Sequence, residues 1–386
     1  MLCCWQKDEK TRARQIDSLT SLRFFAAALV VIFHSKHSFG GFTFVDDFSL
    51  TQAVSMFYVL SGFILAHTHK TITSGRELGM FYASRFARIW PLHLITAVAV
   101  ILIMKHYNYN IPLQDSFLNF TLLQSWIPNQ DTYFSLNGVS WSLSNEIFFY
   151  AIFPLLILNI KNTWKIKLAT TIAITGLMLF AFKDSDAALM TWSTYISPLT
   201  RLSEFMLGIA AYQIYLKIFK ATDTPSAGYS GVELIAIIIA AFAMWSPNLH
   251  LFSNLPAKLN TPVTIWFINC GGALAFAFLI VILAQQRGLI SKALQARPLV
   301  YLGEISFALY MVHQVVIRLF DMYPFLTAGL SSASAFAAYY AASLLAAAIA
   351  HGLIEKPAQK VVLRALGKFR SMPANTKKLH AQQRDI

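Results

Sequence analysis

Long apolar stretches recur along the whole sequence, and each is close to the roughly 20 residues that a helix needs to cross a bilayer. Ten are present, near residues 20–36, 49–68, 87–104, 139–159, 166–182, 195–215, 231–246, 262–284, 299–319 and 332–354. Of the 386 residues, 56% are hydrophobic and only 13% are charged, whereas about 25% are charged in a soluble domain. We therefore predict an all-α integral membrane protein, a bundle of about ten transmembrane helices.

The positions of Lys and Arg test this count, because a missed helix would scramble their alternation between inner and outer loops. With the N-terminus inside, the inner segments hold most of the 31 basic residues. Inner residues include Lys7, Lys10, Arg12, Arg14, Lys70, Arg76, Arg85 and Arg88, and the outer loops hold Lys36, Lys105, Lys183 and Lys258. We expect both termini to be cytoplasmic. The net charge of +13 then reflects topology and attraction to anionic lipids, and it predicts no nucleic-acid partner.

The remaining composition predicts one large membrane domain. Residues 1–360 form the predicted transmembrane domain, and residues 361–386 form a basic cytoplasmic tail. No cleavable signal peptide is visible, so we expect the first apolar stretch to remain as an anchor. The three cysteines have no metal-binding spacing, and we predict neither a metal cofactor nor a disulfide framework.

Two ionisable residues stand out in the first apolar stretch. Arg23 and His34 are eleven residues apart, with only apolar residues between them. Eleven helical residues return to within roughly 20° of the starting direction and rise about 16 Å, so both side chains share one face. Ionisable side chains are costly inside a bilayer and usually mark function. Arg23 has an alternative interpretation, because it lies near the cytoplasmic end and can extend to the lipid headgroups.

His34 is the candidate general base, because a neutral imidazole accepts and returns a proton near physiological pH. Counting along each expected helix places His34, Glu146, Glu204 and His313 at a similar depth. We predict that they form one polar cavity in the outer half of the bundle, with Glu146 orienting His34. The alternative is a histidine that only hydrogen-bonds a neighbouring helix.

Arg85 and Arg88 are the candidate ligands for phosphate groups at the inner surface. They are three residues apart in FYASRFARIWPLH, so a helix places both guanidinium groups on one face. Their planar donors suit phosphate oxygens. Ordinary topological anchoring explains most such arginines and is the alternative interpretation.

Two further sets of polar residues follow helical spacing. Ser306, Tyr310 and His313 form a polar stripe on an otherwise apolar helix, which suits either substrate binding or an interhelical hydrogen-bond network. Arg201 and Glu204 are three residues apart, and we predict an internal ion pair.

Six sequence segments extend these patterns across nearly the whole chain. They are RFFAAALVVIFH from Arg23, FYVLSGFILA at 57–66, RFARIWPLH from Arg85, WSLSNEIFFYAIFP from Trp141, ISFALYMVH at 305–313 and IEKP at 354–357. In this order they resemble the acyltransferase-3 family of bacterial membrane O-acyltransferases, which have about ten helices. Asn145 departs from the family pattern, which has a small apolar residue before the glutamate.

The resemblance implies a reaction and its participants. The donor would be acyl-CoA, most often acetyl-CoA, entering from the cytoplasm, and the acceptor would be a hydroxyl of a saccharide or lipid-linked glycan, as in O-antigen, exopolysaccharide or Nod-factor acetyltransferases. His34 matches the proposed catalytic histidine and Arg23 its helical partner. Arg85 and Arg88 match the arginines linked to CoA binding, and Glu146 matches the acidic residue of the fourth span. The implied location is the bacterial inner membrane.

Several alternatives remain open from sequence. Histidine can act as a base or as a nucleophile, so transfer is either direct or through an acyl-His34 intermediate. A membrane exporter of a glycan or lipid would also place polar residues at mid-membrane, although the inverted repeats and interrupted helices that favour a transporter are not visible. The sequence does not determine the oligomeric state.

Overall fold

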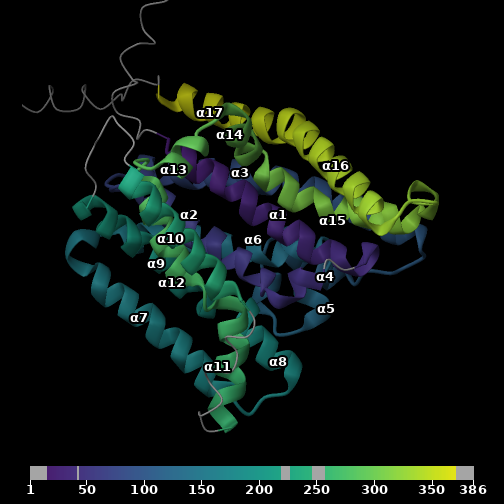
Figure 1. Ribbon diagram of the computed structural model, residues 1–386, viewed down its shortest axis with the longest axis horizontal. Coiled ribbons are helices and arrows are strands. Elements are labelled where there is room, and N and C mark those ends of the chain that lie inside the picture. The colour runs from purple at the N-terminus through teal and green to yellow at the C-terminus, as the bar shows by residue number, and fades with distance from the viewer. Residues whose placement is uncertain (1–14, 41–42, 219–226, 246–256, 371–386) are drawn as a thin grey trace, which may run out of the picture.

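A computed structural model describes residues 15–40, 43–218, 227–245 and 257–370. Within these ranges every regular element is a helix, and the only β contact is an isolated bridge between Phe48 and Trp245. Figure 1 shows the helices packed side by side in one bundle. The predicted all-α fold is therefore confirmed for the described residues. The basic residues before residue 15, and residues 371–386 of the predicted tail, lie outside the described residues.

Every long helix except the last, the polar helix over residues 356–370, overlaps one of the apolar stretches of the sequence. They are α1 (Asp17–Phe39), α2 (Ala53–Thr68), α3 (Gly75–His106), α6 (Trp141–Ile157), α7 (Ile160–Ala181), α9 (Pro198–Ile218), α10 (Ala227–Met244), α11 (Ala257–Cys270), α12 (Ala273–Ala284), α15 (Ser306–Met322), α16 (Ser332–Ala350) and α17 (Lys356–Arg370). The shorter elements are η1 (Thr43–Asp47), η2 (Leu50–Gln52), α4 (Leu113–Phe120), η3 (Gln124–Trp126), α5 (Gln130–Tyr133), η4 (Gly138–Ser140), α8 (Ala187–Thr191), η5 (Trp192–Ile196), α13 (Leu289–Ala293), α14 (Arg297–Glu304), η7 (Pro324–Leu326) and η8 (His351–Glu355).

The predicted number of ten spans is not confirmed. By length and composition, seven segments of the described chain can cross a bilayer, and an eighth is the pair α14 and α15, which is bent by 58°. The other two predicted spans are helical but do not meet this standard. The helix α9 contains the charged residues Arg201, Glu204 and Lys217, and α10 is a shorter apolar helix. The cytoplasmic position of the termini stays a prediction.

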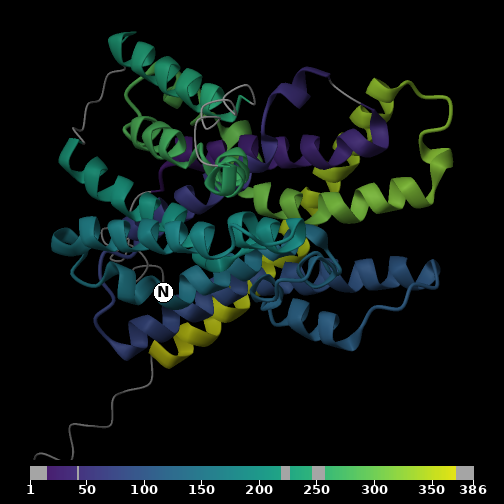
Figure 2. The same cartoon turned by 90° about the horizontal axis from the view of Figure 1, so that it is seen from below.

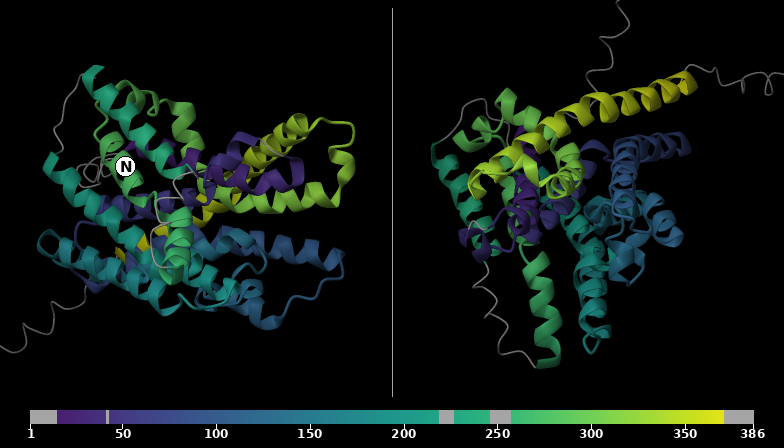
Figure 3. Two further views of the ribbon diagram at one scale, coloured as in Figure 1. Left: turned by 60° about the horizontal axis from the view of Figure 1, so that its bottom comes forward. Right: turned by 90° about the vertical axis from the view of Figure 1, so that its right-hand side faces the viewer.

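The C-terminal helices lie along the outside of the bundle. Figure 3 shows α16, η8 and α17 following one another as a long rod, and Figure 2 shows α17 beside α3. The π-helical turn η8 joins the two longer helices without a break. Because α17 continues past residue 360, the structure places no gap at the predicted domain boundary, and the division into a domain and a tail stays a prediction.

The segment between α3 and α6 folds against the bundle through buried side chains. Asn119 donates from its Nδ2 to the carbonyl oxygen of Ser135 and to the hydroxyl of Ser140. Asn137 donates to the carbonyl oxygen of Met311 in α15, over 2.9 Å. These hydrogen bonds satisfy polar groups that are removed from water, and they attach the segment to the helix that carries His313.

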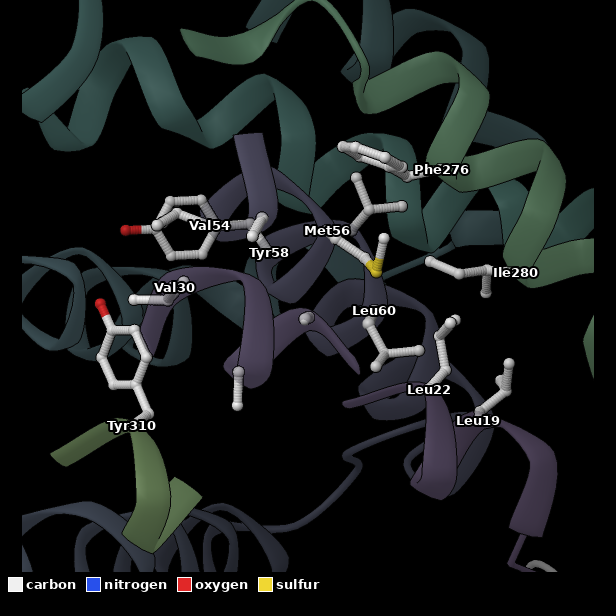
Figure 4. Close-up of a cluster of buried hydrophobic side chains, with 14 of the residues drawn as sticks. Leu19, Leu22, Val30, Val54, Met56, Tyr58, Leu60, Phe276, Ile280 and Tyr310 are labelled. Carbon is white, nitrogen blue, oxygen red and sulfur yellow. The ribbon is translucent and has the colours of Figure 1, made fainter. Parts of the chain in front are cut away.

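The apolar core joins α1, α2 and α12. Figure 4 shows Leu22 of α1, Leu60 and Met56 of α2, and Phe276 and Ile280 of α12 gathered in one cluster. All five side chains are buried. In a bilayer the lipid tails are as apolar as these side chains, so close packing rather than exclusion of water holds the helices together.

The crossing of α2 and α9 depends on two glycines. A Cβ added to Gly62 would lie 2.0 Å from the carbonyl oxygen of Phe205, and one added to Gly208 would lie 2.0 Å from the carbonyl oxygen of Val59. Both distances are far below van der Waals contact. The two backbones therefore touch, as small residues permit at interfaces between membrane helices.

We predict that Gly62→Ala and Gly208→Ala each lower the thermal stability of the purified protein, because the added methyl group forces the two backbones apart. Overpacking of this kind costs about 1–3 kcal/mol. The matched control is Gly176→Ala in α7, where an added Cβ meets nothing within 4 Å. This control should be neutral or slightly stabilising, since Ala favours a helix over Gly. Equal melting temperatures for all three variants would contradict the close crossing.

Candidate active site

Two histidines meet between α1 and α15. Nε2 of His313 lies 3.2 Å from Nδ1 of His34, and the ring centres are 5.1 Å apart. His313 is completely buried, and His34 is partly buried. The two residues are 279 positions apart in the sequence. Within the described ranges, no group of three or more His, Cys, Asp or Glu side chains is placed to hold a metal ion.

Backbone carbonyls determine which nitrogen of each imidazole carries the proton. Nδ1 of His34 lies 3.0 Å from the carbonyl oxygen of Val30, and Nδ1 of His313 lies 3.2 Å from that of Leu309. A carbonyl oxygen only accepts, so we assign the proton to Nδ1 in both rings. Nε2 of His313 then accepts from the same Nδ1–H of His34, which the Val30 carbonyl oxygen shares. The lone pair of His34 consequently lies on Nε2.

Three arginines from two helices form a second group, which we call the arginine cluster: Arg23 of α1 with Arg85 and Arg88 of α3. Arg23 interacts electrostatically with both α3 arginines and with Tyr150 and Glu146 of α6. The guanidinium carbon of Arg85 lies 5.9 Å from the centre of the Tyr150 ring. All three arginines are partly exposed. Three guanidinium groups beside one carboxylate leave a positive site with planar donors, which suits phosphate oxygens.

Glu146 is held by hydroxyl groups. Its Oε1 accepts from the hydroxyl of Ser61 over 3.1 Å and from that of Tyr150 over 2.5 Å. His69, at the end of α2, adds no charge here, because burial and the positive charge of Arg85 lower the pKa of His69 to about 4. A neutral imidazole beside the arginine cluster does not repel the guanidinium groups.

Of the polar stripe on α15, Ser306 makes a local contact, whereas Tyr310 and His313 contact other helices. The hydroxyl of Ser306 donates to the carbonyl oxygen of Gly303, one turn earlier. The hydroxyl of Tyr310 lies 2.7 Å from the hydroxyl of Ser142 and 3.1 Å from the carbonyl oxygen of Val139. The structure thus brings His313 to His34, directs Tyr310 to the start of α6 and leaves Ser306 at the start of its own helix.

The predicted ion pair between Arg201 and Glu204 is confirmed. Nη1 of Arg201 lies 3.2 Å from Oε1 of Glu204, and both side chains are buried. Arg201 also donates to the hydroxyl of Ser55 and to the thiol of Cys270. Its guanidinium carbon lies 5.0 Å from the centre of the Tyr58 ring. Buried charges require such partners, because removal from water is costly.

The cation–π contact between Arg201 and Tyr58, followed by a series of hydrogen bonds, connects the ion pair to α15. Asn145 donates to the hydroxyl of Tyr58 over 3.1 Å, and that hydroxyl donates to the carbonyl oxygen of Ser142 over 3.3 Å. The hydroxyl of Ser142 meets that of Tyr310. Figure 4 shows Tyr58 and Tyr310 at the same edge of the apolar core. Asn145, the departure from the family pattern, therefore takes part in a buried polar network.

The four ionisable residues predicted to line one cavity belong to three sets of contacts. His34 and His313 contact each other, Glu146 accepts from Ser61 and Tyr150, and Glu204 pairs with Arg201. Sequence reasoning missed the role of Tyr150, although its spacing of four residues from Glu146 predicts a contact on one helical face. It also placed His313 in one cavity with His34 and among the substrate-binding residues, but it did not predict a direct contact between the two rings.

The family model of the acyltransferase domain matches residues 16–352. The chain belongs to the acyltransferase-3 family. It is therefore an acyltransferase, and its apolar helices make it a multi-pass membrane protein. No solved structure matches the chain.

Three known proteins resemble the chain to different extents. Acyltransferase MdmB of Streptomyces mycarofaciens is 29% identical over 392 residues, which cover 93% of this chain and 94% of that protein. A putative acetyltransferase, ORF330 of Acidianus two-tailed virus, is 25% identical over 67% of this chain and 71% of its own length. O-acetyltransferase OatA of Staphylococcus aureus is 22% identical over 80% of this chain, and the match spans about half of OatA, 52%.

We predict that Arg201→Met destabilises the protein by about 3–5 kcal/mol, because it leaves the Glu204 carboxylate buried without its positively charged partner. The double variant Arg201→Met with Glu204→Leu should lose less stability, since no buried charge remains. The control is Lys183→Met, which breaks an exposed pair with Asp184 and should cost at most about 1 kcal/mol. Unfolding of the purified proteins measures all three. A double variant less stable than Arg201→Met would contradict this interpretation.

Proposed function

We propose that this acyltransferase moves an acetyl group from cytoplasmic acetyl-CoA to a hydroxyl of a saccharide or lipid-linked glycan. The observation that carries the proposal is the pair His34 and His313, in which backbone carbonyls direct the lone pair of His34 to Nε2. The names of relatives, an acyltransferase and an O-acetyltransferase, support ester formation. A bacterial inner membrane is the proposed location.

In the proposed reaction the acceptor hydroxyl loses its proton to Nε2 of His34 while its oxygen bonds to the thioester carbonyl carbon. The carbon–sulfur bond then breaks, and the CoA thiolate takes the proton from the imidazolium. His313 supports both steps, because its Nε2 accepts from Nδ1 of His34 and so stabilises the positive charge that forms there. A covalent route, with the acyl group first on His34, uses the same nitrogen.

The arginine cluster is the proposed site for the phosphate groups of CoA. Arg23 belongs to the same helix as His34, and the two are separated by about 16 Å along the helix axis. An extended pantetheine arm has a comparable length, so a donor held at Arg85 and Arg88 would bring its thioester toward the histidine pair. In this proposal Glu146 limits the repulsion among the three guanidinium groups.

We predict that His34→Ala adds no acyl ester to the product and still reaches the membrane at the normal level. The histidine supplies the only base that the proposal uses, so removing it removes activation of the hydroxyl. A suitable control is His93→Gln, because His93 is also buried but bonds to the carbonyl oxygen of Asn119. Mass spectrometry of glycans from a deletion strain that carries each variant provides the measurement. Wild-type ester content with His34→Ala would overturn the catalytic assignment.

We predict that Lys at Arg85 or Arg88 weakens acetyl-CoA binding, and that Ala at both positions abolishes it. Lysine keeps the charge but loses the planar two-point contact with phosphate. Binding to the purified protein is measured by titration calorimetry. The control Arg287→Ala removes an arginine that stacks on Tyr229, outside the arginine cluster, and should bind normally. Unchanged affinity for acetyl-CoA in the double-Ala protein would mean that both arginines serve only to anchor the membrane topology.

A further inference from the structure

A pocket outside the sites described above opens between the ends of two helices. Its volume is about 420 Å³. The pocket is lined by Ile103, Met104, Tyr107 and Tyr109 at the end of α3 and by Arg318 and Asp321 of α15. We call it the α3–α15 pocket. Neither the histidine pair nor the arginine cluster contributes a residue to it.

The backbone at the end of α3 holds both tyrosines at this pocket. Asn108 has a positive φ of 54°, and the amide of Tyr109 donates to the carbonyl oxygen of Met104 while that of Asn108 donates to Lys105. This pair of hydrogen bonds is the Schellman motif, in which a residue in the left-handed conformation ends the helix. Tyr107 and Tyr109 flank that residue, so the turn fixes both of them at the pocket.

The two charged residues offer complementary hydrogen-bonding groups. Arg318 is partly buried, and within the described chain no hydrogen bond or salt bridge engages its guanidinium. Asp321 is exposed and interacts with Arg318 electrostatically. A guanidinium only donates and a carboxylate only accepts. A ligand with hydroxyl groups, which both donate and accept, can satisfy the two at once.

The position of the pocket relates it to the proposed reaction. Along α3, Ile103 lies about 27 Å from Arg85, close to the thickness of a bilayer core. Along α15, Arg318 is only about 7.5 Å from His313. Measured along the helix axes, the pocket therefore lies within two turns of His313 and at the end of α3 opposite Arg85 and Arg88.

We propose that the α3–α15 pocket binds a sugar ring of the acceptor, next to the ring whose hydroxyl is acylated. This inference rests on the proposed function and adds to it a site for the saccharide. The tyrosine rings present flat apolar faces to the carbon–hydrogen face of a sugar, and Arg318 and Asp321 bond its hydroxyl groups. A lipid phosphate is a poorer ligand, because the carboxylate of Asp321 would repel it.

The test compares aromatic with aliphatic replacements in a deletion strain. The double variant Tyr107→Leu with Tyr109→Leu keeps apolar bulk but removes both aromatic faces, whereas Trp at both positions keeps them. The control Tyr323→Leu alters an exposed tyrosine at the end of α15 that does not line the pocket. Ester content of the host glycans is measured together with membrane level, and acetyl-CoA binding is measured on each purified protein.

We expect the double-Leu variant to lose at least ten-fold in ester content with normal acetyl-CoA binding, and the double-Trp variant and Tyr323→Leu to stay near wild type. Arg318→Gln should behave like the double-Leu variant. Wild-type ester content in the double-Leu variant would overturn the pocket assignment while leaving the proposed function intact. Weaker binding of the purified double-Leu variant than of the wild-type protein to vesicles rich in phosphatidylglycerol would overturn the proposal and assign the pocket to a lipid. If the wild-type protein itself restores no ester to the deletion strain, the proposed function is wrong, and the pocket assignment that rests on it is wrong as well.

Discussion

The direct contact between the backbones of α2 and α9 determines much of the arrangement inside the bundle. Because Gly62 faces the backbone of Phe205 and Gly208 faces that of Val59, α2 lies close enough to its neighbours for its side chains to contact several of their polar groups. Ser55 and Tyr58 reach Arg201 of α9, and Ser61 reaches Glu146 of α6. A larger residue at the crossing would separate α2 from α9 and leave the buried ion pair with fewer partners. The close packing of α2 against α9 is therefore also what supplies the buried ion pair with its polar partners.

The long helices could be predicted from the sequence because apolar length is a local property. The ion pair of Arg201 and Glu204 was predictable for the same reason, since helical spacing fixes which side chains share a face. The number of spans was harder. A buried ion pair makes α9 polar enough to resemble a surface helix, and the bend of 58° between α14 and α15 divides one apolar stretch into two helices. Both features depend on neighbours that helical periodicity does not reveal.

The sequence predicted which residues belong to the candidate site, but it did not predict which of them contact one another. Each of His34, His313 and Glu146 stands out as an ionisable residue in an apolar stretch, but which of them meet depends on how α1, α6 and α15 pack. Depth along each helix suggested a single layer, because depth ignores the direction in which a side chain points. The contact between His34 and His313 arises from two helices that are far apart in sequence. The α3–α15 pocket was still harder to predict, because it also depends on the left-handed turn at Asn108.

One helix, α15, contributes residues both to the histidine pair and to the proposed sugar pocket. Tyr310 faces the start of α6, His313 faces α1, and Arg318 faces the end of α3. Successive helical residues turn by about 100°, so these three side chains point in different directions and hold α15 against three neighbours. A helix fixed in this way cannot shift toward the sugar pocket without moving His313 relative to His34. The proposed acceptor site and the proposed base are therefore positioned by the same rigid element, which is what a transfer between two bound substrates requires.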